Sequence, residues 1–281
     1  MHFDLPGFDL DVFITATLAE DLGEGGDITS NAVIPVDTRF SGAMDSRDAI
    51  TVAGLPIAEA FFRALDPAVK VELLVEDGTV VRAGAELMRL SGRARAILTA
   101  ERSALNTVQH LSGIATLTRT YVDAIAGTGA TLLDTRKTLP GLRVLEKYAT
   151  RMGGARNHRM RLDDMAMIKD NHVAVAGGVA EAVRRARDAG IAQVVVEVDM
   201  LEQIEPALAA GATHLLLDNM APSTLREAVA VVGGRVPTEA SGGVRLDTIR
   251  AIAETGVTFI SVGRLTQSAP AADIGLDVGA A

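Results

Sequence analysis

Charged side chains gather in one part of this sequence, in a pattern that suits the binding of a small anion. Residues 136–172 contain nine Lys or Arg and four Asp or Glu, a local charge of +5 in a chain whose net charge is −9. A basic cluster inside an acidic protein attracts a small anion rather than a polyanion such as nucleic acid. The first chemistry that the sequence predicts is therefore recognition of a small, negatively charged ligand.

Three of these cations stand directly after short apolar runs that have the length and composition of buried strands. Arg136 and Lys137 follow the run at residues 131–134, and Lys169 ends the run that begins at Met165. A cation at the end of a buried strand loses water unless it meets an anion, so we predict ligand contacts for all three. The basic residues at helical spacing are instead predicted to form the solvated face of a helix; they are Arg143, Lys147 and Arg151.

A regular alternation of strands and helices fills the sequence after Gly127. Six strand-like runs alternate with mostly Ala-rich amphipathic helices, as in a (β/α) barrel or a doubly wound sheet. No glycine-rich dinucleotide or P-loop fingerprint follows the first strand, which disfavours the nucleotide-binding sheets. Six strands are fewer than eight, so a barrel built from them is incomplete. The predicted strands are residues 131–134, 165–169, 193–198, 213–218, 237–240 and 258–262, and the predicted helices are residues 178–189, 201–210, 223–232 and 246–255.

Every one of these strands ends in a polar residue, which favours the barrel, because the carboxyl ends of barrel strands converge on one active-site mouth. Glu197 and Asp218, on neighbouring strands, offer oxygen ligands suited to Mg²⁺ that is held mostly by substrate phosphates. The glycine-rich strand ends suit a phosphate held on backbone N–H groups in front of a helix; they are Ser241-Gly242-Gly243 and Gly263. The predicted mouth takes a sugar phosphate and a metal on one side, and a small acid with more than one carboxylate on the other.

The first part of the chain is predicted to be a smaller unit. A helix is expected over residues 9–22, and the glycine-rich stretch 23–30 is interpreted as a capped turn rather than a phosphate loop. Short strands follow between residues 38 and 98, among them a hairpin over residues 71–84 that turns at Asp77-Gly78. Further helices are predicted at residues 57–65 and 99–126.

Composition excludes several classes of protein. The 281 residues are 48% hydrophobic but only 3% aromatic, so Ala, Val, Leu and Ile must build the core, as in α/β proteins. The absence of cysteine excludes disulfides and thiolate metal sites. The N-terminus lacks the positive charge of a signal peptide, and no apolar run approaches the roughly 18–20 residues of a membrane span. With a pI near 5.1, we expect a cytoplasmic protein that binds neither membranes nor nucleic acid.

Short motifs also follow one another in a fixed order along the chain. They are Glu101–Asn106 (ERSALN), Leu111–Thr116 (LSGIAT), Asp134–Arg143 (DTRKTLPGLR), Asn157–Met160 (NHRM), Ile168–His172 (IKDNH), Leu217–Met220 (LDNM), Glu239–Gly243 (EASGG) and Ser261–Gly263 (SVG). Together they resemble the quinolinate phosphoribosyltransferase family of de novo NAD biosynthesis, whose members are pentosyltransferases also called carboxylating nicotinate-nucleotide diphosphorylases. The resemblance extends from Glu20 to Leu276, almost the entire chain.

The resemblance implies an α/β fold with two domains. An N-terminal α/β sandwich with its linking helix would occupy residues 1–112, and an incomplete seven-stranded α/β barrel would occupy residues 113–281, with its C-terminal tail returning to the sandwich. It also implies a homodimer in which each sandwich domain covers the partner's barrel mouth, with assembly beyond the dimer left open. Arg102 would then reach the neighbouring subunit's substrate, which explains a cation in the first turn of a helix, where the macrodipole disfavours it.

The same resemblance implies the substrates quinolinate and phosphoribosyl pyrophosphate, the products nicotinate mononucleotide, pyrophosphate and CO₂, and Mg²⁺ as cofactor. The carboxylates of quinolinate would be bound by Arg136, His158, Arg159 and Lys169, with Lys137 near the phosphoribosyl donor. The catalytic group would be Lys137, Lys169, Glu197 and Asp218, of which the two acids would also hold Mg²⁺ and ribose hydroxyls. The 5-phosphate would be bound by Ser241, Gly242, Gly243 and Gly263, with Arg264 beside them.

One position departs from the family pattern. The family shows Thr-His-Ser after the last strand, where this chain has Thr266-Gln267-Ser268. Either the phosphate side is weaker here, or Arg264 compensates. An unchanged KM for the phosphoribosyl donor in a Gln267→His variant would show that the position is unimportant.

Three other functions are compatible with the sequence. They are a molybdenum-utilisation paralogue of the same fold, an aldolase that forms a Schiff base on Lys169, and a non-catalytic phosphosugar-binding protein. The intact motif at residues 169–172 and the dicarboxylate cage favour the quinolinate enzyme over the paralogue. Borohydride trapping with a carbonyl substrate would identify the aldolase. Binding of the phosphoribosyl donor without turnover would identify the non-catalytic phosphosugar-binding protein.

Overall fold

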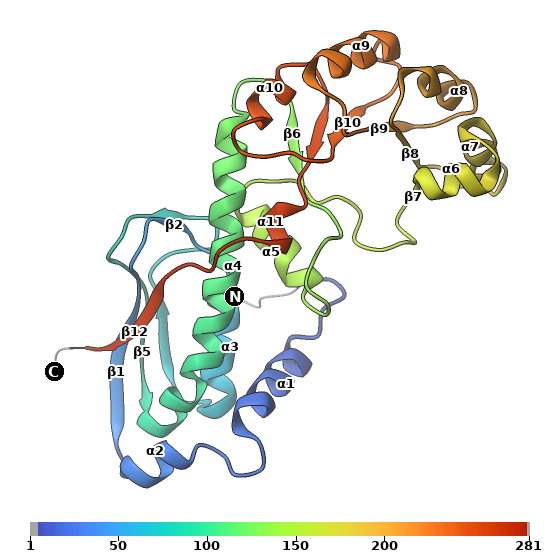
Figure 1. The fold of residues 1–281 in the computed structure, drawn as a ribbon. Helices are drawn as coiled ribbons and strands as arrows, with labels where there is room; N and C mark the ends of the chain where they lie inside the picture. The colour runs from blue at the N-terminus through green and yellow to red at the C-terminus, as the bar shows by residue number, and fades with distance from the viewer. Residues whose placement is uncertain (1–4, 280–281) are drawn as a thin grey trace. The chain divides into compact units, whose positions relative to one another are not determined.

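The computed structural model describes residues 5–279 and divides the chain into two compact units, each made from separate stretches of sequence (Figure 1). The first unit contains the chain up to Leu117, residues 144–154 and the segment from Ser268 onward. The second contains residues 118–143 and 155–267. Within residues 5–279, no helix is long and apolar enough to cross a lipid bilayer.

A four-stranded antiparallel sheet forms the core of the first unit. Its order is β12 (Ile274–Val278), β1 (Arg39–Ser46), β5 (Ala85–Arg93) and β3 (Lys70–Leu73). A separate ladder joins β2 (Ile50–Thr51) to β4 (Val80–Val81). Helices α3 (Leu55–Leu65) and α4 (Ala94–Ala124) lie along one face of the larger sheet (Figure 1). Met44 on β1 and Met88 on β5 are fully buried, so this unit has an apolar core of its own.

Two helices precede this sheet, α1 (Leu10–Leu22) and α2 (Ile28–Val33). The carboxylate of Asp9 accepts a hydrogen bond from the backbone N–H of Val12, and that of Asp27 accepts one from Ser30. Both acids are therefore N-caps, which satisfy helical donors that have no partner within the helix. The capped turn predicted for residues 23–30 is confirmed.

The hairpin predicted over residues 71–84 is wrong, because β3 pairs with β5 while β4 pairs with β2. The cause is the turn residue Asp77. Its carboxylate accepts hydrogen bonds from the backbone N–H of Gly54 at 2.6 Å and of Leu55 at 3.2 Å, where α3 begins. Asp77 thus caps a helix that is distant in sequence, and this tertiary contact separates the two strands that local turn chemistry would join.

The second unit is built on a parallel sheet. Its order is β6 (Thr131–Leu133), β11 (Phe259–Ser261), β10 (Thr238–Ser241), β9 (His214–Asp218), β8 (Val194–Val198) and β7 (Ala166–Ile168). All neighbouring pairs are parallel, and one further parallel bridge, between Leu133 and Arg156, continues the ladder beyond β6. The six predicted strands are confirmed, and a seventh position is marked by that bridge alone.

Helices follow the strands and return the chain to the same end of the sheet each time, as parallel pairing requires. They are α6 (Asp170–Ala176) and α7 (Val179–Asp188) after β7, the 3₁₀ turn η1 (Leu201–Gln203) and α8 (Ile204–Ala209) after β8, α9 (Pro222–Val232) after β9, α10 (Ile249–Ala253) after β10, and α11 (Arg264–Gln267) after β11. All the carboxyl ends of the strands therefore share one end of this unit, and the amino ends share the other.

Helix α5 (Arg143–Met152) overturns the prediction that its basic residues form a solvated face. Glu146 and Lys147 have no exposed surface, and the Glu146 carboxylate lies 2.9 Å from Nε2 of His110 on α4. Of the three basic residues at helical spacing, Arg143 is half-buried and only Arg151 is exposed. Spacing could not reveal this, because a charged side chain is buried wherever a distant element supplies its partner.

Candidate active site

A cavity of about 810 Å³ opens at the carboxyl ends of the parallel strands, within the second unit. Every residue that the sequence placed in the site lines this cavity, with the exception of Arg102. The lining residues predicted from the sequence are Arg136, Lys137, His158, Arg159, Lys169, Glu197, Asp218, Ser241, Gly242, Gly243, Gly263 and Arg264. Residues more than a hundred positions apart meet here because parallel strands end at the same edge of a sheet.

Glu197 and Asp218 lie at the ends of the neighbouring strands β8 and β9. Burial, and then the negative charge of Glu197, raise the pKa of Asp218 above its usual range. Glu197 is partly compensated by Lys169, whose Nζ donates a hydrogen bond to its carboxylate over 2.8 Å. Two carboxylates that repel each other at a cavity mouth fit a divalent cation, because its charge would relieve the repulsion.

Protein groups alone would not complete the coordination of such a cation. In the part of the chain that the structure describes, no three His, Cys, Asp or Glu residues form a metal-binding group. A cation at Glu197 and Asp218 would take its remaining oxygens from water or from the phosphates of a ligand. That arrangement is typical of Mg²⁺, which keeps several waters and favours substrate phosphates.

Two arginines stand close together in the same cavity. Burial, and then the positive charge of Arg136, lower the pKa of Arg159. Arg159 donates from Nη1 to the carbonyl oxygen of Met165 over 3.1 Å. The Nε atom of Arg136 is buried and has no hydrogen-bond partner within residues 5–279. Two neighbouring guanidinium groups, one of them incompletely bonded, suit a ligand that carries at least two anionic groups.

The loop after β10 depends on backbone conformations that glycine adopts easily. Gly242 and Gly243 have φ angles of 88° and 60°. A Cβ atom on Gly242 would collide with the side-chain amide of Asn219, which donates to the Asp218 carboxylate over 2.6 Å. The helix that follows begins only at Ile249. Backbone N–H groups of the loop itself, rather than the N-terminus of a helix, are therefore available to a phosphate at this point.

Gly263 gives Lys137 room at the mouth of the cavity. A Cβ atom on Gly263 would lie 2.7 Å from Cδ of Lys137, which is too close for two carbon atoms. The Oγ1 of Thr266 donates a hydrogen bond to the Lys137 carbonyl oxygen over 2.7 Å, so α11 is fastened to the loop after β6. Gln267, where the family pattern has histidine, lines the same cavity.

Two buried acids to which the sequence assigned no role fix the wall of the site around residues 157–159. Asp134, at the end of β6, accepts hydrogen bonds from Nδ2 of Asn157 at 2.5 Å and from the backbone N–H of His158 at 2.8 Å. Glu239, on β10, has no exposed surface, and its Oε2 lies 3.3 Å from Nε2 of His158. The available signal for Glu239 was a charge inside a buried strand, which always requires a partner.

Arg102 is the predicted site residue that this cavity does not include. It lies on α4, is exposed, and belongs to the other compact unit. It makes no hydrogen bond or ion pair with another described residue. Its guanidinium group is therefore available for a contact outside the chain.

Parallel strands whose carboxyl ends surround a cavity with paired carboxylates, adjacent guanidinium groups and glycine-shaped loops define a barrel-type α/β protein with a site for a polyanionic small molecule. Sequence comparison identifies which one. The model of the quinolinate phosphoribosyl transferase C-terminal domain matches residues 114–277, and that of the N-terminal domain matches residues 27–112. This chain belongs to the quinolinate phosphoribosyl transferase family.

Individual relatives agree with this assignment. The chain is 45% identical to a carboxylating nicotinate-nucleotide pyrophosphorylase of Mycobacterium leprae, over 94% of this chain and 95% of the relative. It is 42% identical to the chloroplastic carboxylating nicotinate-nucleotide pyrophosphorylase of Arabidopsis thaliana, over 97% and 84%. The solved structure of the nicotinate-nucleotide pyrophosphorylase from Francisella tularensis superposes with a TM-score of 0.93 at 38% identity, over 99% of this chain and 100% of that one. The predicted fold class, an incomplete seven-stranded α/β barrel with an N-terminal α/β sandwich domain, is confirmed as an α/β fold with a small N-terminal sheet domain and a C-terminal domain of parallel strands.

Proposed function

We propose that this protein transfers the phosphoribosyl group of phosphoribosyl pyrophosphate to quinolinate and releases one carboxylate as CO₂, giving nicotinate mononucleotide and pyrophosphate. One observation carries the proposal: a single cavity holds adjacent guanidinium groups beside paired carboxylates and glycine-shaped loops. The first set suits a dicarboxylate, and the second suits a sugar phosphate with its metal. The names of the relatives support the same reaction.

Quinolinate is bound through its two carboxylates by Arg136, Arg159 and Lys169, with His158 in the same wall. Arg136 supports this role because its Nε atom is buried without a partner among the described residues, a cost that a bound carboxylate removes. Burial and the positive charge of Arg136 also lower the pKa of Arg159. The protein therefore holds the two cations together before a ligand arrives. Bidentate guanidinium groups also fix the plane of the aromatic ring.

The phosphoribosyl donor occupies the other part of the cavity. Glu197 and Asp218 hold Mg²⁺ and the ribose hydroxyls, and Lys137 faces the pyrophosphate. When bound, Mg²⁺ supplies positive charge against the oxygens of the leaving pyrophosphate. The 5-phosphate is held by backbone N–H groups and nearby side chains; these belong to Ser241, Gly242, Gly243, Gly263 and Arg264.

The chemistry then requires positioning and charge stabilisation rather than a covalent bond to the protein. The ring nitrogen of quinolinate attacks C1 of the ribose as the C1–O bond to pyrophosphate breaks, through a transition state with oxocarbenium character. Lys137 stabilises the charge that develops on the leaving oxygen. The ring nitrogen, now positively charged, accepts electron density when the bond to the adjacent carboxylate breaks. CO₂ leaves, and the ring carbon takes up a proton.

The active form is a homodimer in which Arg102 of one subunit completes the quinolinate site of the other. Arg102 supports this role because it is exposed, has no ion pair with another described residue, and lies outside the cavity of its own chain. A cation in this position adds affinity for the dicarboxylate only when a second copy of the chain is present.

Complementation of two inactive variants tests the shared site. Arg102→Ala and Lys169→Ala are purified separately, then mixed, dissociated and reassembled. A hybrid dimer contains one site in which both residues are intact, so random pairing restores about a quarter of the wild-type activity. A mixture that stays as inactive as its components would refute the shared site.

The reaction itself is tested by following the absorbance of quinolinate with protein, Mg²⁺ and phosphoribosyl pyrophosphate, while CO₂ and pyrophosphate are counted. Consumption of quinolinate with equal release of both products is expected, and nicotinate in a parallel sample should not react. Binding of the phosphoribosyl donor without turnover would instead support the non-catalytic phosphosugar-binding protein or the molybdenum-utilisation paralogue. The aldolase alternative finds no support in the geometry, because Lys169 donates to Glu197 and is not surrounded by apolar groups.

A further inference from the structure

A buried carboxylate in the parallel sheet contacts side chains that line the cavities at the two ends of the sheet. Glu239 stands on the central strand β10, between β9 and β11, and has no exposed surface. Its Oε2 atom lies 3.3 Å from Nε2 of His158 and 3.1 Å from Nε2 of His214. Burial alone would raise its pKa, but the polar side chains of His158, His214 and Ser261 outweigh burial and hold the pKa at about 2, although neither carboxylate oxygen has a partner with full hydrogen-bond geometry among the described residues. Glu239 is therefore ionised at neutral pH, in a place where an unpaired charge would be very costly.

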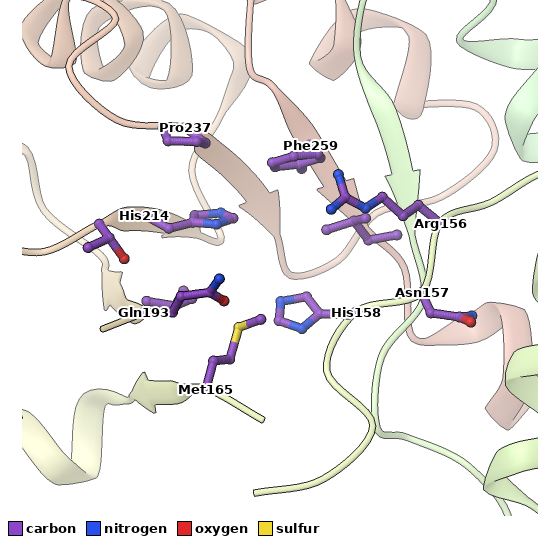
Figure 2. A pocket seen from close by; sticks show the side chains of 11 residues that line it. Arg156, Asn157, His158, Met165, Gln193, His214, Pro237 and Phe259 are labelled. Atoms are coloured by element: carbon purple, nitrogen blue, oxygen red, sulfur yellow. The ribbon is translucent and has the colours of Figure 1, made fainter. Parts of the chain in front are cut away.

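Both imidazole rings contact the same oxygen of Glu239. His158 lines the candidate active site at the carboxyl ends of the strands, and it also lines a second cavity of about 420 Å³ at their amino ends. His214, the first residue of β9, lines the second cavity and not the first, and its ring stacks on Phe259 with centroids 5.5 Å apart. Figure 2 shows both imidazole rings turned into this second cavity from separate walls.

The contact made by the second ring nitrogen of His158, Nδ1, indicates where the ring can carry a proton. Nδ1 lies 2.7 Å from the backbone nitrogen of Arg159, and since a backbone N–H can only donate, Nδ1 must accept. An acceptor Nδ1 carries no proton, so a neutral ring would hold its single proton on Nε2, which lies 3.3 Å from Oε2 of Glu239. Nδ1 is therefore occupied by the Arg159 N–H, and Nε2 lies beside the Glu239 carboxylate. A direct bond from His158 to a substrate carboxylate would require one of these contacts to break.

The same contacts also fix Arg159, the residue after His158 in the chain. The backbone N–H of His158 is held by Asp134 at 2.8 Å, its ring holds the backbone N–H of Arg159, and the Arg159 guanidinium donates to the Met165 carbonyl. The position of Arg159 in the cavity thus depends on a series of contacts that starts at Glu239. The alternative, a cationic His158 that binds the ligand itself, leaves the short contact between Nδ1 and the Arg159 N–H unexplained.

We propose that Glu239, which His214 also contacts, is a positioning residue that fixes His158 as the neutral Nε2–H tautomer and thereby orients Arg159 toward a carboxylate of the substrate. His158 then acts through Arg159 instead of serving as a carboxylate ligand. The identity of that substrate rests on the proposed function, whereas the tautomer and the network do not. The amino-end cavity becomes part of the active site's support, because His214 reaches Glu239 from it.

The tautomer is tested first, on the full-length protein without ligand. Ring nitrogen chemical shifts of ¹⁵N-histidine-labelled protein are recorded at pH 7, and His158 is assigned as the signal lost in a His158→Asn variant. The expected pattern is a bare Nδ1 and a protonated Nε2, with that pattern lost in Glu239→Gln. A doubly protonated ring, or a proton on Nδ1, overturns the proposal whatever the substrate proves to be.

Binding is tested next by calorimetry with quinolinate and, separately, phosphoribosyl pyrophosphate. Glu239→Gln is expected to weaken quinolinate binding about tenfold and to change donor binding by less than about twofold. The matched control is Glu146→Gln, the same substitution in the other buried His–Glu pair, which should leave both affinities unchanged. Unaltered quinolinate affinity in folded Glu239→Gln overturns the proposal.

A second pair of variants covers the possibility that Glu239→Gln does not fold. His214→Leu removes the polar contact of His214 with Glu239 and is expected to weaken quinolinate binding about threefold, and His214→Gln, which keeps a polar side chain that can donate, should restore most of the loss. Equal quinolinate affinities in the two His214 variants would show that His214 does not support Glu239. A wild-type protein that binds no quinolinate would refute the proposed function, and the ring shifts would then decide the network alone.

Discussion

The two ends of the parallel sheet carry opposite kinds of side chain. At the carboxyl ends, charged groups such as Arg136, Lys169 and Asp218 line an open cavity, and some of their bonding capacity is unused. At the amino ends, the smaller cavity is lined mainly by apolar and aromatic groups, and the charged Arg156 lies over the Phe259 ring at 5.8 Å. One end is arranged to meet a ligand, and the other is arranged to hold the sheet together.

Two acids on neighbouring strands differ in the same way as the two ends of the sheet. Asp218, at the open end, has a raised pKa because burial and Glu197 both oppose its charge. Glu239, inside the sheet, has a pKa of about 2 because the polar side chains of His158, His214 and Ser261 outweigh its burial. The protein thus opposes the charge of Asp218, which a bound cation would stabilise, and supports the charge of Glu239.

The largest effect is expected from Arg136→Ala. Removing a guanidinium that meets a carboxylate in a desolvated site should lower kcat/KM for quinolinate about a thousandfold. The matched control is Arg187→Ala, which removes a guanidinium that binds the carbonyls of Ile191 and Ala192 just before β8, at the amino end. Steady-state kinetics on both variants decide the matter, and a comparable loss in Arg187→Ala would abolish the contrast between the two ends.

Asp218→Asn should separate activity from stability. Because the folded-state pKa is raised, the ionised form costs stability at any pH above the unfolded value, and the cost disappears when the charge is removed. We expect activity to fall about a hundredfold while Tm rises by up to about 2 °C, since the group is partly solvated. In the wild type, kcat/KM should fall as pH decreases through this raised pKa. A lower Tm in the variant would show that Asp218 is structural.

Gly263→Ala should affect the donor side of the cavity alone. The new methyl group displaces the flexible end of Lys137, so KM for phosphoribosyl pyrophosphate should rise about tenfold while the affinity for quinolinate is retained. Gly25→Ala is the control, because a Cβ atom there meets nothing within 4 Å. Kinetics with each substrate varied in turn measure the effect. A rise confined to quinolinate would place Lys137 on the wrong side of the site.

The smallest effect on catalysis is expected at the amino end, from Phe259→Leu. The ring stacks on His214 and lies beneath the Arg156 guanidinium, so its loss should cost about 1 kcal/mol of unfolding free energy. Chemical denaturation measures that loss, and both KM values should stay within about twofold of the wild type. If kcat/KM falls more than tenfold in a folded variant, the amino end contributes more to the reaction than its apolar lining suggests.

The sequence allowed most of the second unit and its site to be predicted, because the signals there are local. Each buried strand is a short apolar run, and the residue after it is polar, so Glu197 and Asp218 could be placed at one end of the sheet without coordinates. The sequence did not reveal that Asp77 caps a helix, that Lys147 is buried, or that Glu239 lies between two histidines. Each of these depends on a partner far along the chain.

By itself, the sequence determined the strand–helix alternation, the family and the residues that gather at the carboxyl ends, since periodicity and motif order are properties of neighbouring residues. Only the tertiary structure decided the state of the individual groups: the hydrogen bond that His158 Nδ1 accepts, the raised pKa of Asp218 and the unused Nε of Arg136. The physical reason is that burial, charge and hydrogen bonding depend on distances between segments that folding brings together.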